Sequence, residues 1–200
     1  MDSRISHTPE GLFLFDLPLG LLLVFVFHNV IRDPLFDNLP SFLQRRVMTF
    51  KTFDWNGYFI RHWFVVVWSL LLGAASHLFW DSFTHNHSFF VELLPALRTN
   101  VTLFDGSMPA YRVLQHVSTV VGGAVVWAWV MKFPMGPEVK TIRTPYYWVL
   151  VICITITIAL VRLTLPLDEK VFPQMVVTLI AALVIALTAA PVIIKEKLHV

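Results

Sequence analysis

Three histidines and a carboxylate gather in one stretch of the chain, between Ser76 and His87. His77, Asp81 and His85 follow the pattern H-x-x-x-D-x-x-x-H, and steps of four residues keep side chains on one face of an α-helix. Because histidine and carboxylate are ligands for Zn²⁺ and other divalent ions, this face is a candidate metal site. A structural alternative stays open, in which the same side chains form a polar, solvated helix end.

One ion cannot take all three side chains from a straight helix, because His85 lies about 12 Å along the axis from His77. Three arrangements are open. The helix ends near Asp81 and the chain turns back, or Asp81 bridges two ions, or His85 serves a purpose other than metal binding.

Three further ionisable side chains are candidates for the same site. His7, near the N-terminus, would be solvated if it stood alone. Asp16 interrupts an apolar stretch and must pair with something, either as a metal ligand or as acceptor for the ring N–H of a ligating histidine. His116 is a candidate ligand as well, although Ser118 and Thr119 beside it also suit an interhelical hydrogen-bonding role.

The composition is that of a membrane protein. The chain has 200 residues, of which 56% are hydrophobic and 14% charged, and its mean hydropathy is +0.69. Soluble domains carry about 25% charged residues. A net charge of +2 gives no sign of nucleic-acid binding. The single cysteine, Cys153, excludes an internal disulfide and a thiolate metal cluster.

Hydrophobic runs of roughly 20 residues are long enough to cross a bilayer. The sequence predicts five such helices, at residues 11–31, 63–80, 110–131, 146–165 and 172–194. We therefore expect an all-α, polytopic transmembrane helical bundle that forms a single integral-membrane domain over residues 1–200. The basic and aromatic connection 32–62 is expected to lie along the membrane surface.

The distribution of lysine and arginine predicts the orientation of these spans. With the N-terminus outside, the three inner segments hold five, three and two of these residues, which is ten of the 15 in the chain. Because cytoplasmic segments are enriched in Lys and Arg, this bias predicts an N-out/C-in topology. All the candidate site residues then fall on the outer side, whereas His28 and His62 fall on the cytoplasmic side.

Four motifs carry a resemblance to a known family. They are Ser6-His7-Thr8, Phe15-Asp16-Leu17-Pro18-Leu19-Gly20, the block from Gly73 to His85, and Leu114-Gln115-His116-Val117-Ser118-Thr119. Up to about residue 130 the chain resembles a bacterial integral-membrane family of unknown function. That family is distantly similar to proteins described as membrane-bound metal-dependent hydrolases of the bacterial inner membrane.

The resemblance implies a multi-pass protein of the bacterial inner membrane and a candidate hydrolase activity without a defined substrate. Such families usually carry another Ser-His pair and a Pro-Asp pair upstream of the Ser-His-Thr motif, around an additional hydrophobic segment. This chain begins too late to hold them. If those groups belong to the site, the expectation is a shortened gene model or an incomplete enzyme.

We predict a divalent metal, with zinc as the first expectation, at the outward mouth of the bundle. Its predicted ligands are His77, Asp81 and His85, with help from His7 and His116. Asp16 and His116 are the candidate catalytic residues, because a metal-activated water needs a proton acceptor. The location favours a lipid or lipid-linked substrate and the lipid bilayer as partner, and oligomeric state stays open. The alternative is a non-catalytic protein, either a transporter or proton relay, or a structural bundle.

Overall fold

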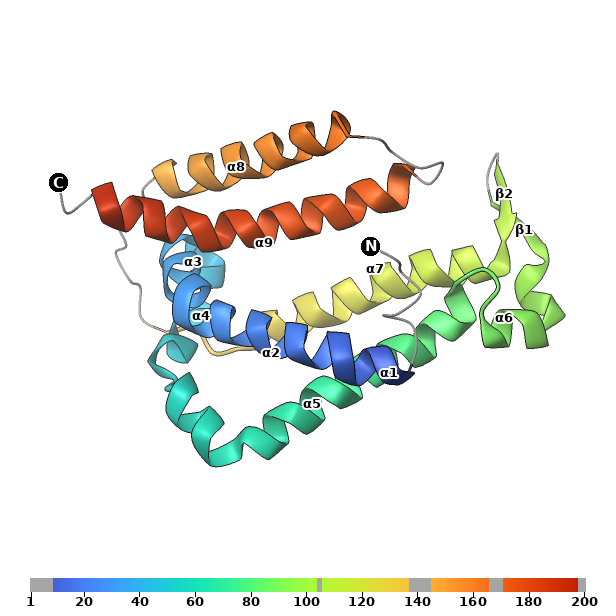
Figure 1. Ribbon diagram of the computed structural model, residues 1–200, viewed down its shortest axis with the longest axis horizontal. Coiled ribbons are helices and arrows are strands. Elements are labelled where there is room, and N and C mark those ends of the chain that lie inside the picture. Colours follow the sequence, from blue (N-terminus) through green and yellow to red (C-terminus); the bar gives the residue numbers. More distant parts are fainter. Residues whose placement is uncertain (1–8, 104–105, 137–144, 166–170, 198–200) are drawn as a thin grey trace. The chain divides into compact units, whose positions relative to one another are not determined.

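The computed structural model describes residues 9–103, 106–136, 145–165 and 171–197 (Figure 1). Nearly all of this is helical, which confirms the predicted all-α architecture. Five helical stretches are long and apolar enough to cross a membrane: Leu12–Asn38, Trp55–Leu93, Ala110–Met131, Pro145–Leu163 and Gln174–Ile194. The predicted orientation in the membrane stays a prediction.

The first span is a helix with two π-helical turns. It comprises α1 (Pro9–Gly11), η1 (Leu12–Asp16), α2 (Leu17–Val26), η2 (Phe27–Ile31) and α3 (Arg32–Asn38), and the two η segments are the π turns. The helix continues beyond the predicted end at residue 31 and runs through Pro34 to Asn38.

The second span, α5 (Trp55–Thr84), is longer than predicted at both ends. It bends at His62, whose backbone angles of φ −132° and ψ 28° are not helical. The predicted start at residue 63 therefore coincides with the bend. Residues 55–61, which precede the bend, are also helical. The helix then runs through Asp81 to Thr84, past the predicted end at residue 80.

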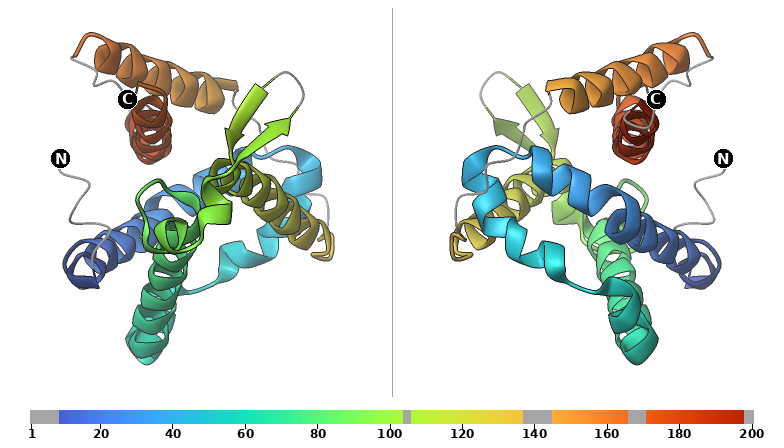
Figure 2. Two further views of the ribbon diagram at one scale, coloured as in Figure 1. Left: turned by 90° about the vertical axis from the view of Figure 1, so that its right-hand side faces the viewer. Right: turned by 90° about the vertical axis from the view of Figure 1, so that its left-hand side faces the viewer.

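A short cap joins α5 to the third span, α7 (Ala110–Met131). It contains the helices α6 (Phe89–Leu93) and η4 (Pro95–Arg98) and an antiparallel hairpin of β1 (Asn100–Leu103) and β2 (Gly106–Pro109). Figure 2 shows the hairpin, and in its register Val101 pairs with Met108. These strands were not predicted from the sequence.

The chain divides into two compact units. The first unit comprises Met1–Leu22 and Asn56–Phe133. Within it α2 and α5 run in opposite directions and meet at Gly20, where an added Cβ would lie 3.3 Å from Leu70 Cδ2 (Figure 1). A glycine at this position therefore allows the two helices to approach closely.

The second unit comprises Leu23–Trp55 and Pro134–Val200. Its helices α8 (Pro145–Leu163) and α9 (Val171–Lys197) lie side by side (Figures 1 and 2). Their shared core is formed by fully or almost fully buried residues: Tyr147, Val151, Ala186 and Ala190. The two alanines are one helical turn apart, and such small residues let helices pack closely in a membrane. The prediction that the chain forms one domain stays a prediction.

Candidate functional site

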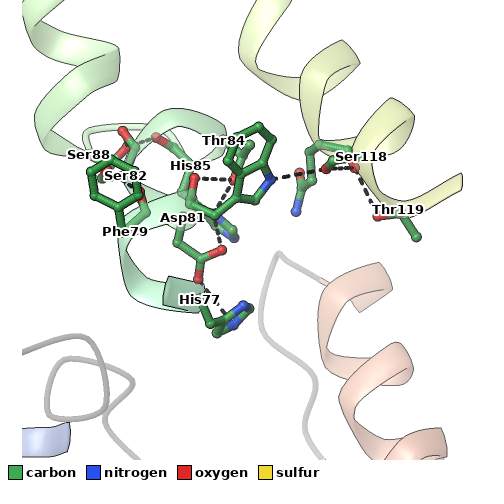
Figure 3. A network of polar contacts seen from close by, with 11 residues as sticks. His77, Phe79, Asp81, Ser82, Thr84, His85, Ser88, Ser118 and Thr119 are labelled. Carbon is green, nitrogen blue, oxygen red and sulfur yellow. Dashed lines mark hydrogen bonds and ion pairs between the residues drawn. The ribbon is translucent and has the colours of Figure 1, made fainter. Parts of the chain in front are cut away.

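Asp81 lies between two imidazoles at the end of α5 (Figure 3). Its Oδ2 is 3.4 Å from Nε2 of His77, and its Oδ1 is 3.5 Å from Nδ1 of His85. The Asp81 side chain is 13% exposed, compared with 72% for His77 and 48% for His85. A shielded carboxylate therefore turns one oxygen towards each of two accessible rings.

Helix α5 ends at Thr84, three residues after Asp81, and the chain then turns back through α6, so all three arrangements considered from the sequence stay open. The His85 amide still donates a helical hydrogen bond to the Asp81 carbonyl, at 3.0 Å. Nδ1 of His85 also lies 3.2 Å from the Thr84 hydroxyl, which is buried. The His85 ring thus has the Asp81 carboxylate and the Thr84 hydroxyl near the same nitrogen.

The turn after α5 holds this helix end in place. His87 adopts a left-handed backbone conformation, with φ 59°, and the Ser88 hydroxyl donates to two carbonyls near the end of α5. Helix α6 then packs back on α5, where the rings of Phe83 and Phe90 stack at 4.1 Å between centroids. This cap fixes where α5 stops and so fixes the position of His85.

His116 lies on α7 and not beside Asp81. Helix α7 is joined to α5 by a hydrogen bond of 3.2 Å from Trp80 Nε1 to the Ser118 hydroxyl (Figure 3). His116 precedes Ser118 by two residues, a rotation of roughly 200° about the helix. It is exposed on the side of α7 opposite the α5 contact. The structure therefore does not bring His116 to the other candidate residues.

Asp16, in contrast, belongs to the helix face that meets α5. It lies one turn before Gly20, which contacts Leu70, so in antiparallel helices Asp16 is about level with Ala74. On α5, positions 70, 74, 77 and 81 follow the spacing of one helical face. By this spacing Asp16 shares the face of the first span that contacts α5 at Leu70.

Each π turn of the first span contains an ionisable side chain. Asp16 ends η1, and His28 lies within η2. The His28 ring stacks on Trp55 at 4.4 Å, and its buried Nδ1 has no hydrogen-bond partner among the described residues. π turns inside helices are frequent at functional sites. The backbone geometry at Asp16 and at His28 is therefore a further reason to consider a functional role for both residues. The sequence alone did not reveal these turns.

The complete ligand set predicted for a metal ion is not assembled. No group of three or more His, Cys, Asp or Glu side chains could hold an ion within the described ranges. His7 lies outside the described residues. What the structure does bring together is a carboxylate flanked by two imidazoles, a donor set that fits a divalent ion but would need further ligands.

Comparison with known proteins identifies the family. A family model described as "Domain of unknown function (DUF4184)" matches residues 1–192. No curated protein and no solved structure matches the chain. Since the family model covers nearly the whole sequence, the chain belongs to the DUF4184 family, a family of unknown function.

Proposed function

We propose that this protein is a metal-dependent hydrolase of the bacterial inner membrane, with its site at the Asp81 end of α5. The observation that carries the proposal is the Asp81 carboxylate, 13% exposed and within 3.5 Å of two imidazoles. Ionisable groups at the end of an apolar span are costly and are usually retained for function. The family that the chain resembles is distantly similar to proteins described as membrane-bound metal-dependent hydrolases, and this similarity supports the same proposal.

His77 and Asp81 are the proposed core of the metal site, because side chains four residues apart on a helix can bind one ion together. His85 faces the second Asp81 oxygen, so it would either serve a second ion or orient the carboxylate. His7 is the proposed additional ligand. A bound divalent ion would supply Lewis-acid activation of water and of a carbonyl or phosphoryl group.

Asp16 is the proposed proton acceptor. It is partly buried, and its spacing of four residues from Gly20 puts it on the face of the first span that contacts α5 at Leu70. His116 would have to change sides of α7 to take this role, and the proposal does not depend on it.

A lipid or lipid-linked substrate suits this site best. The neighbouring helix α6 exposes Phe89 at 69% and Leu93 at 60%, so the cap beside Asp81 presents an apolar surface. Aromatic residues of this kind favour the boundary between lipid and water. A substrate held there would keep its chain in the bilayer and its polar linkage at the level of the site.

One observation favours a second candidate, a proton or ion relay. Two ionisable side chains of the first span, Asp16 and His28, both stand in π turns. Ionisable groups along one span are also the signature of ion pathways. Proton uptake by the protein in sealed vesicles, lost in both Asp16→Asn and His28→Gln, would favour this candidate.

The hydrolase proposal is tested with detergent-purified protein and chromogenic carboxylic and phosphoric esters of increasing chain length. We expect turnover that needs a divalent ion, stops with a chelator and is lost in Asp81→Asn and Asp16→Asn. Asp54→Asn is the matched control, since Asp54 is an exposed carboxylate at the other end of α5. Absence of metal-dependent turnover on every ester, with zinc and manganese each supplied, would count against the proposal.

A further inference from the structure

Thr84 is a buried polar residue at the end of α5, and the proposed function leaves it without a role. It is 1% exposed, although the side chain of the next residue, His85, is 48% exposed. Burial of a hydroxyl is costly unless the hydroxyl is hydrogen-bonded. The contacts of this hydroxyl therefore indicate what the threonine contributes to the site.

The Thr84 hydroxyl contacts one backbone carbonyl and one imidazole. Its Oγ1 donates to the Trp80 carbonyl at 3.3 Å, and the same oxygen lies 3.2 Å from Nδ1 of His85 (Figure 3). A hydroxyl has one hydrogen to donate and lone pairs that accept. Because the hydrogen is engaged with Trp80, the oxygen is an acceptor towards His85.

Donation from a threonine to the carbonyl four residues earlier recurs in this protein. Such hydrogen bonds, each of 2.8 Å, are formed in α8 and α9 by Thr155, Thr157, Thr178 and Thr188. Threonine hydroxyls bond in this way inside helices because that carbonyl lies within reach of Oγ1. The hydrogen bond from Thr84 to Trp80 has the same direction, and it leaves the Thr84 lone pairs for His85.

The Asp81 carboxylate acts on the same ring nitrogen. Its Oδ1 lies 3.5 Å from Nδ1 of His85. An ionised carboxylate has no hydrogen, so it attracts an N–H group and repels a lone pair. Two oxygen acceptors thus approach Nδ1, and both favour the tautomer of His85 that carries its hydrogen there.

A hydrogen on Nδ1 decides which nitrogen of His85 takes part in chemistry. A neutral imidazole carries one ring hydrogen, so its lone pair is then on Nε2. A metal ion or a proton is bound through that lone pair. Ligating histidines commonly donate the other ring N–H to a carboxylate, which fixes the ring and its tautomer. Thr84 and Asp81 provide acceptors of this kind for His85.

We propose that Thr84 is a positioning residue, whose hydroxyl, together with Asp81, holds His85 in the tautomer with its hydrogen on Nδ1. An ion or a proton taken up by His85 is therefore bound at Nε2. The consequence for metal binding rests on the proposed function, whereas the tautomer is a property of the site without metal. The two claims are measured separately.

The tautomer is measured by solid-state nitrogen NMR on the metal-free full chain in lipid vesicles, labelled at histidine and held at alkaline pH. The His85 signals are assigned by difference from His85→Gln. We expect the wild type to carry the His85 hydrogen on Nδ1. Thr84→Val keeps the shape of the side chain but lacks the hydroxyl, so the ratio of the Nδ1–H form to the Nε2–H form should fall roughly fivefold, the effect of one hydrogen bond.

Three further variants complete this measurement. Thr84→Ala also lacks the hydroxyl and should show the same fall, while Thr84→Ser retains a hydroxyl and should keep the wild-type ratio. Thr178→Val is the matched control, because it removes a hydroxyl with the same type of hydrogen bond in α9, and it should leave the ratio unchanged. A wild type with the hydrogen on Nε2, or an unchanged ratio in the variants without the Thr84 hydroxyl, would overturn the proposal.

Zinc titration of the same proteins separates this proposal from the hydrolase proposal. We expect Thr84→Val to bind zinc about 10-fold more weakly than the wild type and Thr84→Ser to bind it equally well, since groups that orient a ligand contribute about 10–100-fold to affinity. Equally tight binding in Thr84→Val would overturn the positioning role and leave the metal site intact. A wild type that has the hydrogen on Nδ1 but binds no zinc would support the tautomer and count against the hydrolase.

Discussion

Replacement of Asp81 by asparagine separates a metal site from a structural helix end. Asparagine keeps the size of the side chain and can still hydrogen-bond, but it loses the negative charge. In the structure His77 and His85 lie 3.4 and 3.5 Å from the carboxylate, and both rings are largely accessible to solvent. Ion pairs of this kind contribute about 0–1 kcal/mol. We therefore expect Asp81→Asn to fold with a free energy of unfolding close to that of the wild type.

The two accounts differ once a divalent ion is added. At a hundredfold excess of zinc over Kd, binding to the folded state adds about 2.7 kcal/mol to the free energy of unfolding. For a chain of this length that corresponds to a rise in Tm of about 5–11 °C. If loss of the carboxylate weakens binding by about 100-fold, the variant gains only about 0.4 kcal/mol at the same zinc concentration, or about 1 °C.

The assay is thermal unfolding in detergent, with and without zinc, for the wild type, Asp81→Asn and the control Asp54→Asn. The account predicts a zinc-dependent rise in the wild type and the control and almost none in Asp81→Asn. In a structural helix end, the substitution would be neutral or mildly stabilising and zinc would have no effect. A wild type that responds to no divalent ion, or an Asp81→Asn protein that responds equally, would refute the reasoning.

Three further predictions concern topology and packing. In a cysteine-free background, a cysteine at Ser88 should react with an impermeant reagent from outside and one at Ser41 should be protected, because the charge bias predicts N-out; the opposite pattern would reverse the topology. Gly20→Leu should lower the free energy of unfolding by about 1–3 kcal/mol, since even a Cβ at this position would lie 3.3 Å from Leu70, and an unchanged unfolding midpoint would contradict the close α2–α5 contact. Tyr147→Phe should be neutral or stabilising by about 1 kcal/mol in the same measurement, because the buried Tyr147 hydroxyl has no hydrogen-bond partner among the described residues, and a clear loss would reveal one.

The spans could be predicted from the sequence because their length and hydropathy leave few alternatives. Their ends could not. Pro34 and the polar residues before His62 resemble helix boundaries, yet both lie within helices. The hairpin was missed although the sequence contains Asp105-Gly106, a dipeptide typical of tight turns. Its strands have four residues each, too few to stand out in hydrophobic periodicity.

The candidate site was predictable where it depends on one helix. The spacing of four residues places His77 and His85 beside Asp81, as the structure has them. Contacts between helices were not predictable. The first span meets α5 where Gly20 lies against Leu70. Ser118 is the α7 residue that bonds to Trp80, and His116 therefore lies on the other side of α7. Such contacts are set by tertiary packing and leave no periodic signal in the sequence.

The most direct test of the central claim is the metal content of detergent-purified protein, measured by elemental mass spectrometry. The account predicts a bound divalent ion in the wild type and a loss of at least 10-fold on substitution of a site residue. The site variants are His77→Ala, Asp81→Asn and His85→Ala, and the controls that should retain the ion are His28→Ala, His62→Ala and His199→Ala. A wild type without any bound divalent ion, or equal metal content in all six variants, would contradict the existence of the site.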